Sequence, residues 1–266
     1  MSKAKVKRLL RRFGLMRLSD NLRYQIMKIQ NRKDNQNFRK EHPDVVIPPD
    51  YILYEAHQLK YRSYYNYGLS NAKRLITLFE TYTDLSEKKI LDWGCGPARI
   101  IRHFPELLKN SICYGTDYNT DTIAWNQEHI KGVTFHTNGI FPPTVYEDEF
   151  FDAIYGLSVL THLSEENHFN WINELYRIAK TGAILILTTH GKAFREKLVK
   201  DDQLLFDTNN LVVQGNTLEG HRTFAAFHPP KYMLKLFAGK FAVLDLIEGT
   251  FTNGNIAQDK WILKKI

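Results

Sequence analysis

The chain has 266 residues, of which 43% are hydrophobic and 24% are charged, as in an ordinary globular protein. Its two cysteines, Cys95 and Cys113, are too few for a disulfide framework and fit a reducing compartment. The longest apolar run is far shorter than the roughly 20 residues that span a bilayer, and no secretory signal follows the basic start. We therefore expect a cytoplasmic protein.

The net charge of +7 is concentrated at the N-terminus. Residues 1–40 contain 13 Lys/Arg and 2 Asp/Glu, a net charge of +11, whereas the other 226 residues contain 23 basic and 27 acidic groups, a net charge of −4. A mildly acidic body argues against a nucleic-acid groove in the main domain, so nucleic acid is not the partner that we expect.

Residues 1–43 form a basic arm that predicts two helices separated at Gly14, with Ser19 and Asp20 as the cap of the second. In the first helix, four apolar residues recur at helical spacing among basic ones: Val6, Leu9, Leu10 and Phe13. Such a helix can lie on an anionic membrane, and residues 1–33 are the segment expected to make this contact, peripherally at the inner membrane surface. The alternative is a solvated arm, or one that packs against a partner.

Residues 44–84 begin with a proline-punctuated linker and continue as helices that we expect to break near Gly68. Six of the chain's fourteen tyrosines fall between Tyr51 and Tyr67. We interpret this segment as a lid that contributes to an acceptor pocket, and ordinary aromatic packing of a helical lid is the alternative. The residues expected to contact the acceptor are Tyr61, Arg62, Tyr64 and Tyr65, together with His228 from further along the chain.

Strands and helices alternate in residues 85–266, which predicts an α/β fold. The expected strands are residues 90–93, 111–116, 133–137, 151–156 and 183–189, and the expected helices are residues 97–109, 120–130 and 164–179. Residues 201–228 form an insertion with a small hairpin, which we interpret as a cap. Because the last two strands, within residues 241–249 and 259–265, are joined by a short link, they should be antiparallel. The sequence thus predicts a Rossmann-like, doubly wound, mostly parallel seven-stranded sheet with an antiparallel last strand and a helical N-terminal extension.

The stretch ILDWGCGPARI, residues 90–100, carries a nucleoside-site pattern. A buried strand containing Asp92 is followed by Gly94 and Gly96, which let the main chain approach a ligand where a Cβ would collide. Asp117 ends the next strand, 21 residues after Gly96, where a carboxylate can accept two hydrogen bonds from a ribose diol. A purely structural turn is the alternative for the glycine pair alone, but the two acids favour a nucleoside.

The type of nucleoside follows from what surrounds the glycines. A dinucleotide fingerprint requires a third glycine at position 99, where Arg99 stands. The pattern of Asp92, Gly94 and Gly96 instead resembles motif I of the class I S-adenosylmethionine-dependent methyltransferases, with Ala98 where many relatives have glycine. The resemblance extends from about residue 85 to the C-terminus and includes the stretches FHTNGI, FDAIYGLSVLTHL and QDKWILKK. The stretch TTHG and the insertion behind it look like methyltransferases of bacterial surface-polysaccharide pathways.

The resemblance implies S-adenosylmethionine as the cofactor, and it implies the residues that contact it. Many relatives have aspartate where Asn138 stands, and an amide oxygen can serve the same adenine amino group. The implied contacts are Asp92, Gly94, Cys95, Gly96, Asp117, Tyr118, Asn138, Gly139, Ile140, Leu157 and Ser158.

Two histidines are candidates for a general base, which methyl transfer needs where the acceptor is a hydroxyl. His162 follows the fourth strand and His190 ends the fifth, so both should lie at the carboxyl edge of the sheet. The alternative is that His162 only packs at a helix entry. His221 and His228 are weaker candidates, and His168 is expected at the surface.

The absence of several motifs limits the classes of methyl acceptor that we expect. After the fourth strand there is no Asn/Asp-Pro-Pro-aromatic tetrad, no Pro-Cys pair and no carboxylate cluster, so amino methylation of a base, cytosine C5 methylation and a metal site are all disfavoured. The favoured function is methyl transfer to a hydroxyl of a small molecule or glycan. An RNA or protein methyltransferase and a non-catalytic nucleoside-binding module are the alternatives, with a nicotinamide oxidoreductase more distant. The oligomeric state is left open.

Overall fold

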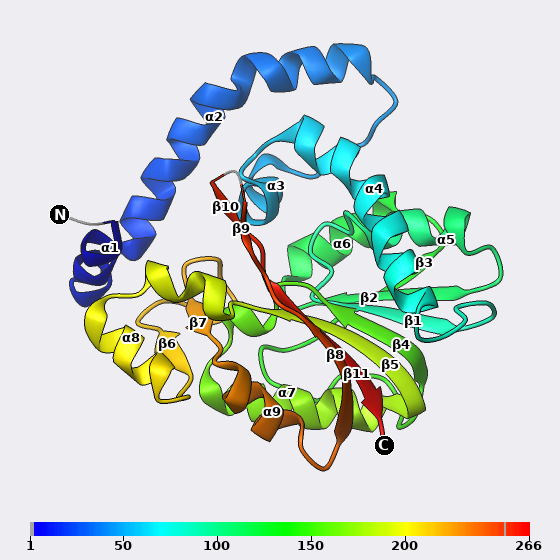
Figure 1. Cartoon of the computed structure of the whole chain (residues 1–266). Coiled ribbons are helices and arrows are strands. Elements are labelled where there is room, and N and C mark those ends of the chain that lie inside the picture. The colour runs from blue at the N-terminus through cyan, green and yellow to red at the C-terminus, as the bar shows by residue number, and fades with distance from the viewer. Residues whose placement is uncertain (1–2, 253) are drawn as a thin grey trace. The chain divides into compact units, whose positions relative to one another are not determined.

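The computed structural model describes residues 3–252 and 254–266 (Figure 1). The helices and 3-10 turns are α1 Lys3–Arg12, α2 Met16–Glu41, α3 Asp50–His57, α4 Tyr61–Glu80, η1 Ile101–His103, α5 Phe104–Leu107, α6 Thr120–His129, η2 Leu160–His162, α7 Glu165–Ile178, η3 Lys192–Lys197, α8 Lys200–Asp207 and α9 Pro230–Phe237. The strands are β1 Lys89–Trp93, β2 Ile112–Asp117, β3 Val133–Thr137, β4 Phe151–Gly156, β5 Ala179–Thr189, β6 Val212–Gln214, β7 Ala225–Phe227, β8 Phe241–Ile247, β9 Phe251–Thr252, β10 Asn255–Ile256 and β11 Asp259–Lys265. The first two residues of the expected basic arm lie outside the described residues.

Seven strands form one mixed sheet in the order β3-β2-β1-β4-β5-β11-β8. β2 runs parallel to β1 and β3, and β4 runs parallel to β5, whereas β11 is antiparallel to both β5 and β8. The interior strands are almost continuously apolar and buried, as parallel strands covered on both faces require. The expected Rossmann-like fold with an antiparallel last strand is confirmed.

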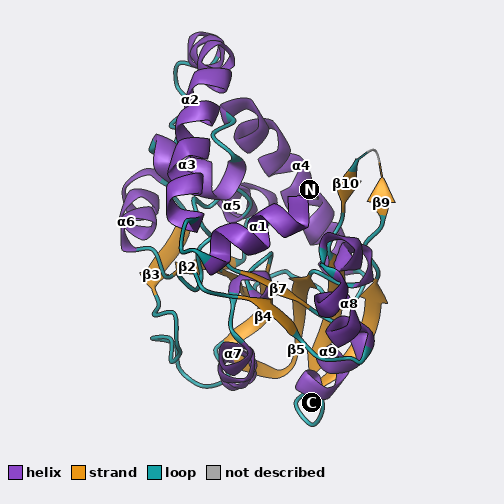
Figure 2. Ribbon diagram, turned by 90° about the vertical axis from the view of Figure 1, so that its left-hand side faces the viewer, coloured by secondary structure: helices purple, strands orange, loops and turns teal. Residues whose placement is uncertain are grey.

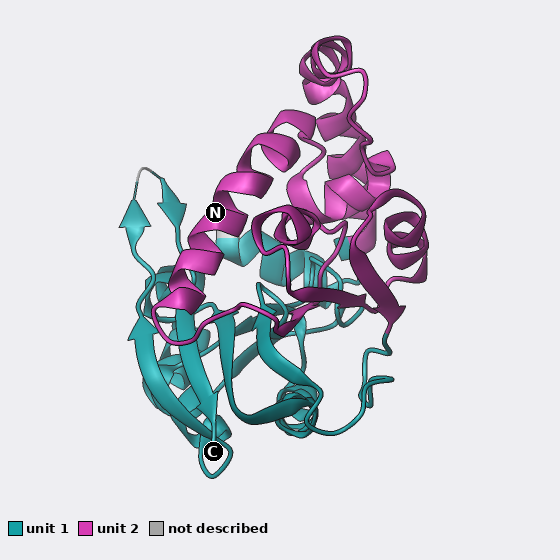
Figure 3. Cartoon of the chain, turned by 90° about the vertical axis from the view of Figure 1, so that its right-hand side faces the viewer, with its two compact units in different colours: residues 1–16, 138–266 teal, residues 17–137 magenta. Residues whose placement is uncertain are grey.

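The chain divides into two compact units (Figure 3). Unit 1 comprises residues 1–16 and 138–266, and it contains α1, α7, α8, α9 and the strands from β4 onward. Two short antiparallel ribbons, β6–β7 and β9–β10, accompany its main strands (Figure 2). Unit 2 comprises residues 17–137, with most of α2, the helices α3 to α6 and the three parallel strands β1 to β3.

Gly68 does not break the lid helices as expected. α4 runs through it without interruption, and the break falls earlier, at Gln58 and Leu59, whose φ angles of 54° and 57° are left-handed. An ideal Cβ on Gly68 would lie 2.6 Å from the carbonyl oxygen of Arg99 and 2.8 Å from Nε2 of His103. The glycine is therefore a contact point between α4 and the segment after β1, and not a helix terminator.

Two further expected elements differ in extent. α2 begins at Met16, so Ser19 and Asp20 do not cap it, and Asp20 instead is buried and accepts a 2.8 Å hydrogen bond from the Tyr54 hydroxyl. The expected helix over residues 97–109 is reduced to η1 and α5, because Pro105 can occupy only the first turn of a helix. Among the described residues, no helix combines the length and the apolar character needed to cross a bilayer.

Candidate functional site

The glycine turn after β1 is attached to the end of β2 through its main chain. The amides of Gly94 and Cys95 both donate to the carbonyl oxygen of Thr116, at 2.8 and 2.9 Å. Gly94 and Gly96 have φ angles of 73° and 49°, in the left-handed region that favours glycine. No atom lies within 4 Å of an ideal Cβ on Gly96, so open space adjoins the turn where a ligand can approach the main chain.

Asp117 lies directly against this turn, as the sequence predicted. The Gly96 amide donates to its Oδ2 at 3.0 Å, and the Asn119 amide donates to its Oδ1 at 2.9 Å. The Tyr118 amide also bonds this carboxylate, and because its two oxygens offer four lone pairs, acceptor capacity is left for a ribose hydroxyl. Burial raises the pKa of Asp117, and the nearby negative charge of Glu55 raises it further. The two parts of the predicted nucleoside site are therefore brought together within unit 2.

Two residues at this site were not predicted from the sequence. Asn126 on α6 is completely buried, and its Nδ2 donates to the carbonyl oxygen of Gly96 at 2.8 Å. A polar amide at a position that the helical pattern predicts to be buried indicates a specific hydrogen-bond partner, so Asn126 could have been found from the sequence. Glu55 on α3 accepts a hydrogen bond from the Tyr51 hydroxyl, and its charge raises the pKa values of Asp117 and Tyr118. Its position 62 residues before Asp117 gives no local signal.

Of the predicted lid residues, Tyr64 reaches the glycine turn. Its hydroxyl donates to the carbonyl oxygen of Pro97 at 2.8 Å and accepts from Nη1 of Arg102 at 3.0 Å. Burial raises the pKa of Tyr64, so the hydroxyl stays protonated and able to donate. Tyr64 thus holds α4 against the loop that follows Gly96.

The other three lid residues contact α2 and α3 instead. The Tyr61 hydroxyl donates to Asp50 at 2.6 Å, and Arg62 forms ion pairs with Glu41 and Asp34. Tyr65 packs its ring against those of Phe38 and His42. These residues join the N-terminal helices of unit 2, and the structure does not bring them to the glycine turn.

His162 and His190 have the same anchoring. Nδ1 of His162 lies 2.7 Å from the carbonyl oxygen of Phe224, and Nδ1 of His190 lies 3.0 Å from that of Ala226. A carbonyl only accepts, so each Nδ1 carries the proton and each Nε2 has a free lone pair in the neutral ring. Among the residues that the structure describes, neither Nε2 has a hydrogen-bond partner. Phe224 and Ala226 are two residues apart, so their carbonyls point to the same side of this extended segment.

Burial lowers the pKa of both histidines. The pKa of His190 falls to about 3, and the pKa of His162 is lowered by burial and by the neighbouring His221 and Arg222. Both rings are therefore neutral at neutral pH, which is the form a general base requires.

His168 and His228 form a buried pair. Their Nε2 atoms are 2.8 Å apart, and Nδ1 of His168 lies 2.7 Å from the carbonyl oxygen of Ser164. Both side chains are completely buried, so the expectation of a surface position for His168 was wrong, because it lies on the buried face of α7. The ring of His228, predicted to contact an acceptor, is enclosed in the core of unit 1.

The loops after β3 and β4 hold five further predicted cofactor contacts, all in unit 1, whereas Asp92 lies in β1 and Tyr118 follows β2 in unit 2. Ser158 has a left-handed φ of 65°, and its amide donates to Oγ1 of Thr188 at 2.8 Å. Oγ of Ser158 and Oγ1 of Thr188 both donate to Oε1 of Gln258, at 3.0 and 2.6 Å. A non-glycine residue in this conformation costs about 1–3 kcal/mol, and such strain is concentrated at functional loops. Leu157 directly precedes it.

The loop of residues 138–140 is fastened separately. Nδ2 of Asn138 donates to the Gly139 carbonyl oxygen at 2.7 Å, and Nε1 of Trp171 donates to the Ile140 carbonyl oxygen at 2.8 Å. The second bond attaches this loop to α7. Among the described residues there is no group of three or more His, Cys, Asp or Glu arranged to hold a metal ion.

Arg11 attaches α1 to the predicted cap. Its Nη1 donates to the carbonyl oxygens of Gln214 and Gly215, at 2.5 and 3.0 Å, and its Nη2 donates to that of Thr223 at 2.5 Å. These carbonyls flank the loop between β6 and β7, which leads into the segment that anchors His162 and His190. Of the basic arm, α1 is thus part of the cap structure of unit 1.

Replacing Arg11 with alanine is expected to loosen this loop, because three carbonyl oxygens lose a charged donor and each such bond contributes about 1.5–3 kcal/mol. Amide hydrogen exchange in residues 212–227 should accelerate at least tenfold, while exchange in β4 and β5 stays unchanged. Arg12→Ala, which removes an exposed charge from the same helix, is the matched control. Equal exchange in both variants would show that Arg11 does not hold the cap.

Comparisons with known proteins agree with this geometry. Residues 91–187 match a family model described as a methyltransferase domain. A malonyl-[acyl-carrier protein] O-methyltransferase of Bacillus cereus is 24% identical over 177 residues, which cover 63% of this chain and 61% of that protein. The match therefore spans less than two thirds of the curated relative.

Solved structures share the fold at low sequence identity. An S-adenosylmethionine-dependent methyltransferase of Methanosarcina mazei aligns with a TM-score of 0.56 at 20% identity, over 71% of this chain and 97% of that one. The magnesium protoporphyrin IX methyltransferase of Synechocystis, solved with S-adenosylhomocysteine, aligns with a TM-score of 0.54 at 16% identity, over 90% and 98%. Residues 91–187 of this chain are therefore a methyltransferase domain, and the chain has the class I fold that the sequence predicted.

Proposed function

We propose that this protein transfers a methyl group from S-adenosylmethionine to a hydroxyl of a small molecule or glycan, with His162 as the general base. The observation that carries the proposal is the anchoring of His162, whose Nδ1–H is fixed on the Phe224 carbonyl while its Nε2 lone pair remains free. The printed name of the Bacillus cereus relative, an O-methyltransferase, supports oxygen as the acceptor atom.

The residues around Gly96 fit an adenosine. Open space adjoins its α-carbon, and the Asp117 carboxylate beside it retains acceptor capacity for a ribose diol. We assign the ribose to Asp117, the methionine end to the main chain of residues 94–96, and Tyr118 to the adenine. Residues 138–140 and Leu157 with Ser158 stay assigned to the same cofactor by the family resemblance.

When bound, the sulfonium supplies an electrophilic methyl group and a neutral leaving group, so a dry and well-positioned site contributes much of the rate. The chain must then accept the hydroxyl proton, and Nε2 of a neutral histidine can accept it. His162 suits this role better than His190, because a base is most effective when its pKa is near the working pH and the pKa of His190 is lowered as far as about 3. We assign His190 to orienting the acceptor.

We extend the proposal to membrane contact through residues 1–33. On α2, Leu18, Leu22 and Ile29 are 68%, 63% and 75% exposed, and their spacing of four and seven residues puts them on one face among basic side chains. This pattern fits an anionic bilayer surface. Leu22→Gln combined with Ile29→Gln should reduce co-sedimentation with phosphatidylglycerol vesicles severalfold, whereas binding equal to that of the unmodified protein would contradict the proposed contact.

The acceptor class is tested with methyl-labelled S-adenosylmethionine and fractionated cell extract. We expect label in a small-molecule, lipid-linked sugar or polysaccharide fraction, and not with His162→Ala. Label in RNA or protein would replace this proposal with that alternative. Binding of S-adenosylhomocysteine without any labelled product would favour a nucleoside-binding module.

A further inference from the structure

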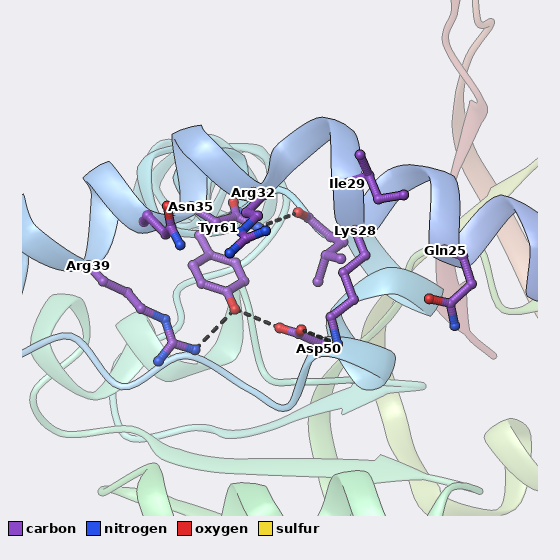
Figure 4. Close-up of a pocket in the computed structure, with 10 residues that line it drawn as sticks. Gln25, Lys28, Ile29, Arg32, Asn35, Arg39, Asp50 and Tyr61 are labelled. Carbon is purple, nitrogen blue, oxygen red and sulfur yellow. Dashed lines mark hydrogen bonds and ion pairs between the residues drawn. The ribbon is translucent and has the colours of Figure 1, made fainter.

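A cavity of about 470 Å³ in unit 2 lies beside α2 and is separate from the glycine turn (Figure 4). α2 supplies one wall, and the start of α3, Leu59 in the short connection before α4, and the start of α4 supply the rest. The lining residues are Gln25, Lys28, Ile29, Arg32, Asn35, Gln36, Arg39, Asp50, Leu59 and Tyr61.

The cavity collects positive charge. Lys28, Arg32 and Arg39 project from one face of α2, since they are four and seven residues apart, and Asp50 is the single acid in the lining. The formal charge of the lining is therefore +2. Lys28 and Arg32 are four residues apart, and like charges at this spacing destabilise a helix by about 0.2–0.5 kcal/mol.

Asp50, the one acid in the lining, already has a hydrogen-bond donor and an ion-pair partner. Asp50 accepts a 2.6 Å hydrogen bond from the Tyr61 hydroxyl and lies 3.5 Å from Nζ of Lys28. Neither Arg32 nor Arg39 is ion-paired with a carboxylate among the described residues, so both guanidinium groups retain donors.

Arg39 is held in place. Its Nη2 donates to the Tyr61 hydroxyl at 3.0 Å, and its guanidinium carbon lies 5.1 Å from the centre of that ring. Figure 4 shows Arg39 and Asp50 meeting the same hydroxyl from opposite sides. Asn35 makes the wall rigid, because its side chain bonds the Leu59 carbonyl at 3.0 Å and the Tyr61 amide at 3.2 Å. The site therefore combines fixed geometry with unneutralised charge.

We propose that this cavity binds a phosphate-type dianion, a phosphate monoester or a diphosphate, through Arg32 and Arg39 with Lys28 at its edge. A phosphate monoester carries about −1.5 to −2 at pH 7, which matches the lining, whereas one carboxylate would leave it half neutralised. Arginine forks also fit phosphate oxygens in a bidentate manner.

The cavity could bind a phosphate group of the methyl acceptor, and this part of the inference rests on the proposed function. α3 joins the two places: Asp50 at its start lines the cavity, and Glu55 acts on Asp117 and Tyr118. We infer that the acceptor carries a phosphate group that binds in this cavity.

The test is calorimetry of the full chain with inorganic pyrophosphate at low salt, with S-adenosylhomocysteine titrated separately. Binding of pyrophosphate is expected, and Arg32→Gln combined with Arg39→Gln should weaken it at least tenfold. Arg32→Gln alone should weaken it severalfold, and it leaves the Tyr61 contacts intact. Arg23→Gln, which removes an exposed charge from another face of α2, is the control and should leave pyrophosphate affinity unchanged. All variants should keep their affinity for S-adenosylhomocysteine.

No pyrophosphate binding by the unmodified protein, or equal binding by the double variant and the control, would overturn the proposal. Failure of S-adenosylhomocysteine to bind would instead overturn the proposed function, while leaving the pyrophosphate result interpretable. Competition by pyrophosphate against vesicles of phosphatidic acid identifies the source: displacement from vesicles assigns the cavity to a lipid phosphate, and pyrophosphate binding without vesicle binding assigns it to a water-soluble phosphorylated acceptor.

Discussion

Replacing Asp117 with asparagine is expected to weaken binding of S-adenosylhomocysteine about 100-fold. Both carboxylate oxygens already accept main-chain amides, from Gly96 and Asn119. An asparagine has one acceptor oxygen, so its NH2 group would face one of those donors and distort the turn. The ribose would also lose a charged acceptor, worth about 1.5–3 kcal/mol for each hydrogen bond, and 1.4 kcal/mol corresponds to a factor of ten.

Calorimetry with S-adenosylhomocysteine measures this loss of affinity, and Asp121→Asn, which changes an exposed acid in the first turn of α6, is the control.

The pH dependence of S-adenosylhomocysteine binding gives a second test of Asp117. Burial raises the pKa of Asp117, so affinity should be constant at neutral pH and fall as the pH is lowered through that raised pKa, above the ordinary aspartate range. Asp117→Asn should lack this acid limb. Affinity within threefold of the unmodified protein would show that Asp117 does not hold the ribose.

Replacing His162 with alanine is expected to lower kcat about 100-fold, the lower end of what a general base contributes, while affinity for S-adenosylhomocysteine changes less than threefold. His190→Ala should lower kcat about tenfold, since we assign this residue to orienting the acceptor. The pKa of His162 is lowered by burial, so the active neutral form persists to pH values below the ordinary histidine range. The acid limb of kcat should therefore lie below pH 6.5.

Steady-state kinetics with the identified acceptor test these values, and His129→Ala, on α6 in unit 2, serves as the control. Unchanged turnover in both His162→Ala and His190→Ala would dispose of the general base. An acceptor that is ionised at neutral pH, such as a carboxylate, would explain that outcome.

The parts of the fold that the sequence predicted depend on local patterns. The alternation of strands and helices predicted the parallel part of the sheet, and the short link between the last two strands predicted their antiparallel pairing. The spacing of 21 residues between Gly96 and Asp117 correctly predicted that the two lie together. The predicted helix over residues 97–109 is too long, because Pro105 can occupy only the first turn of a helix. The predicted break at Gly68 is wrong, because this glycine serves close packing and not helix termination.

What the sequence did not reveal depends on contacts between distant residues. The charge of Glu55 raises the pKa of Asp117, although Glu55 lies 62 positions earlier in the chain. Arg11 donates hydrogen bonds to carbonyl oxygens more than 200 residues further along the chain. The enclosure of His168 and His228 likewise follows from pairing two segments 60 residues apart. The charged cavity beside α2 forms only because α2 packs against the start of α4, and local patterns in one sequence do not predict that packing.

A structure of the protein with S-adenosylhomocysteine tests the central assignment most directly. We predict that both ribose hydroxyls lie within hydrogen-bond distance of the Asp117 carboxylate, and that the homocysteine portion lies against the main chain of residues 94–96. A nucleoside bound elsewhere, or a ribose that does not touch Asp117, would contradict it.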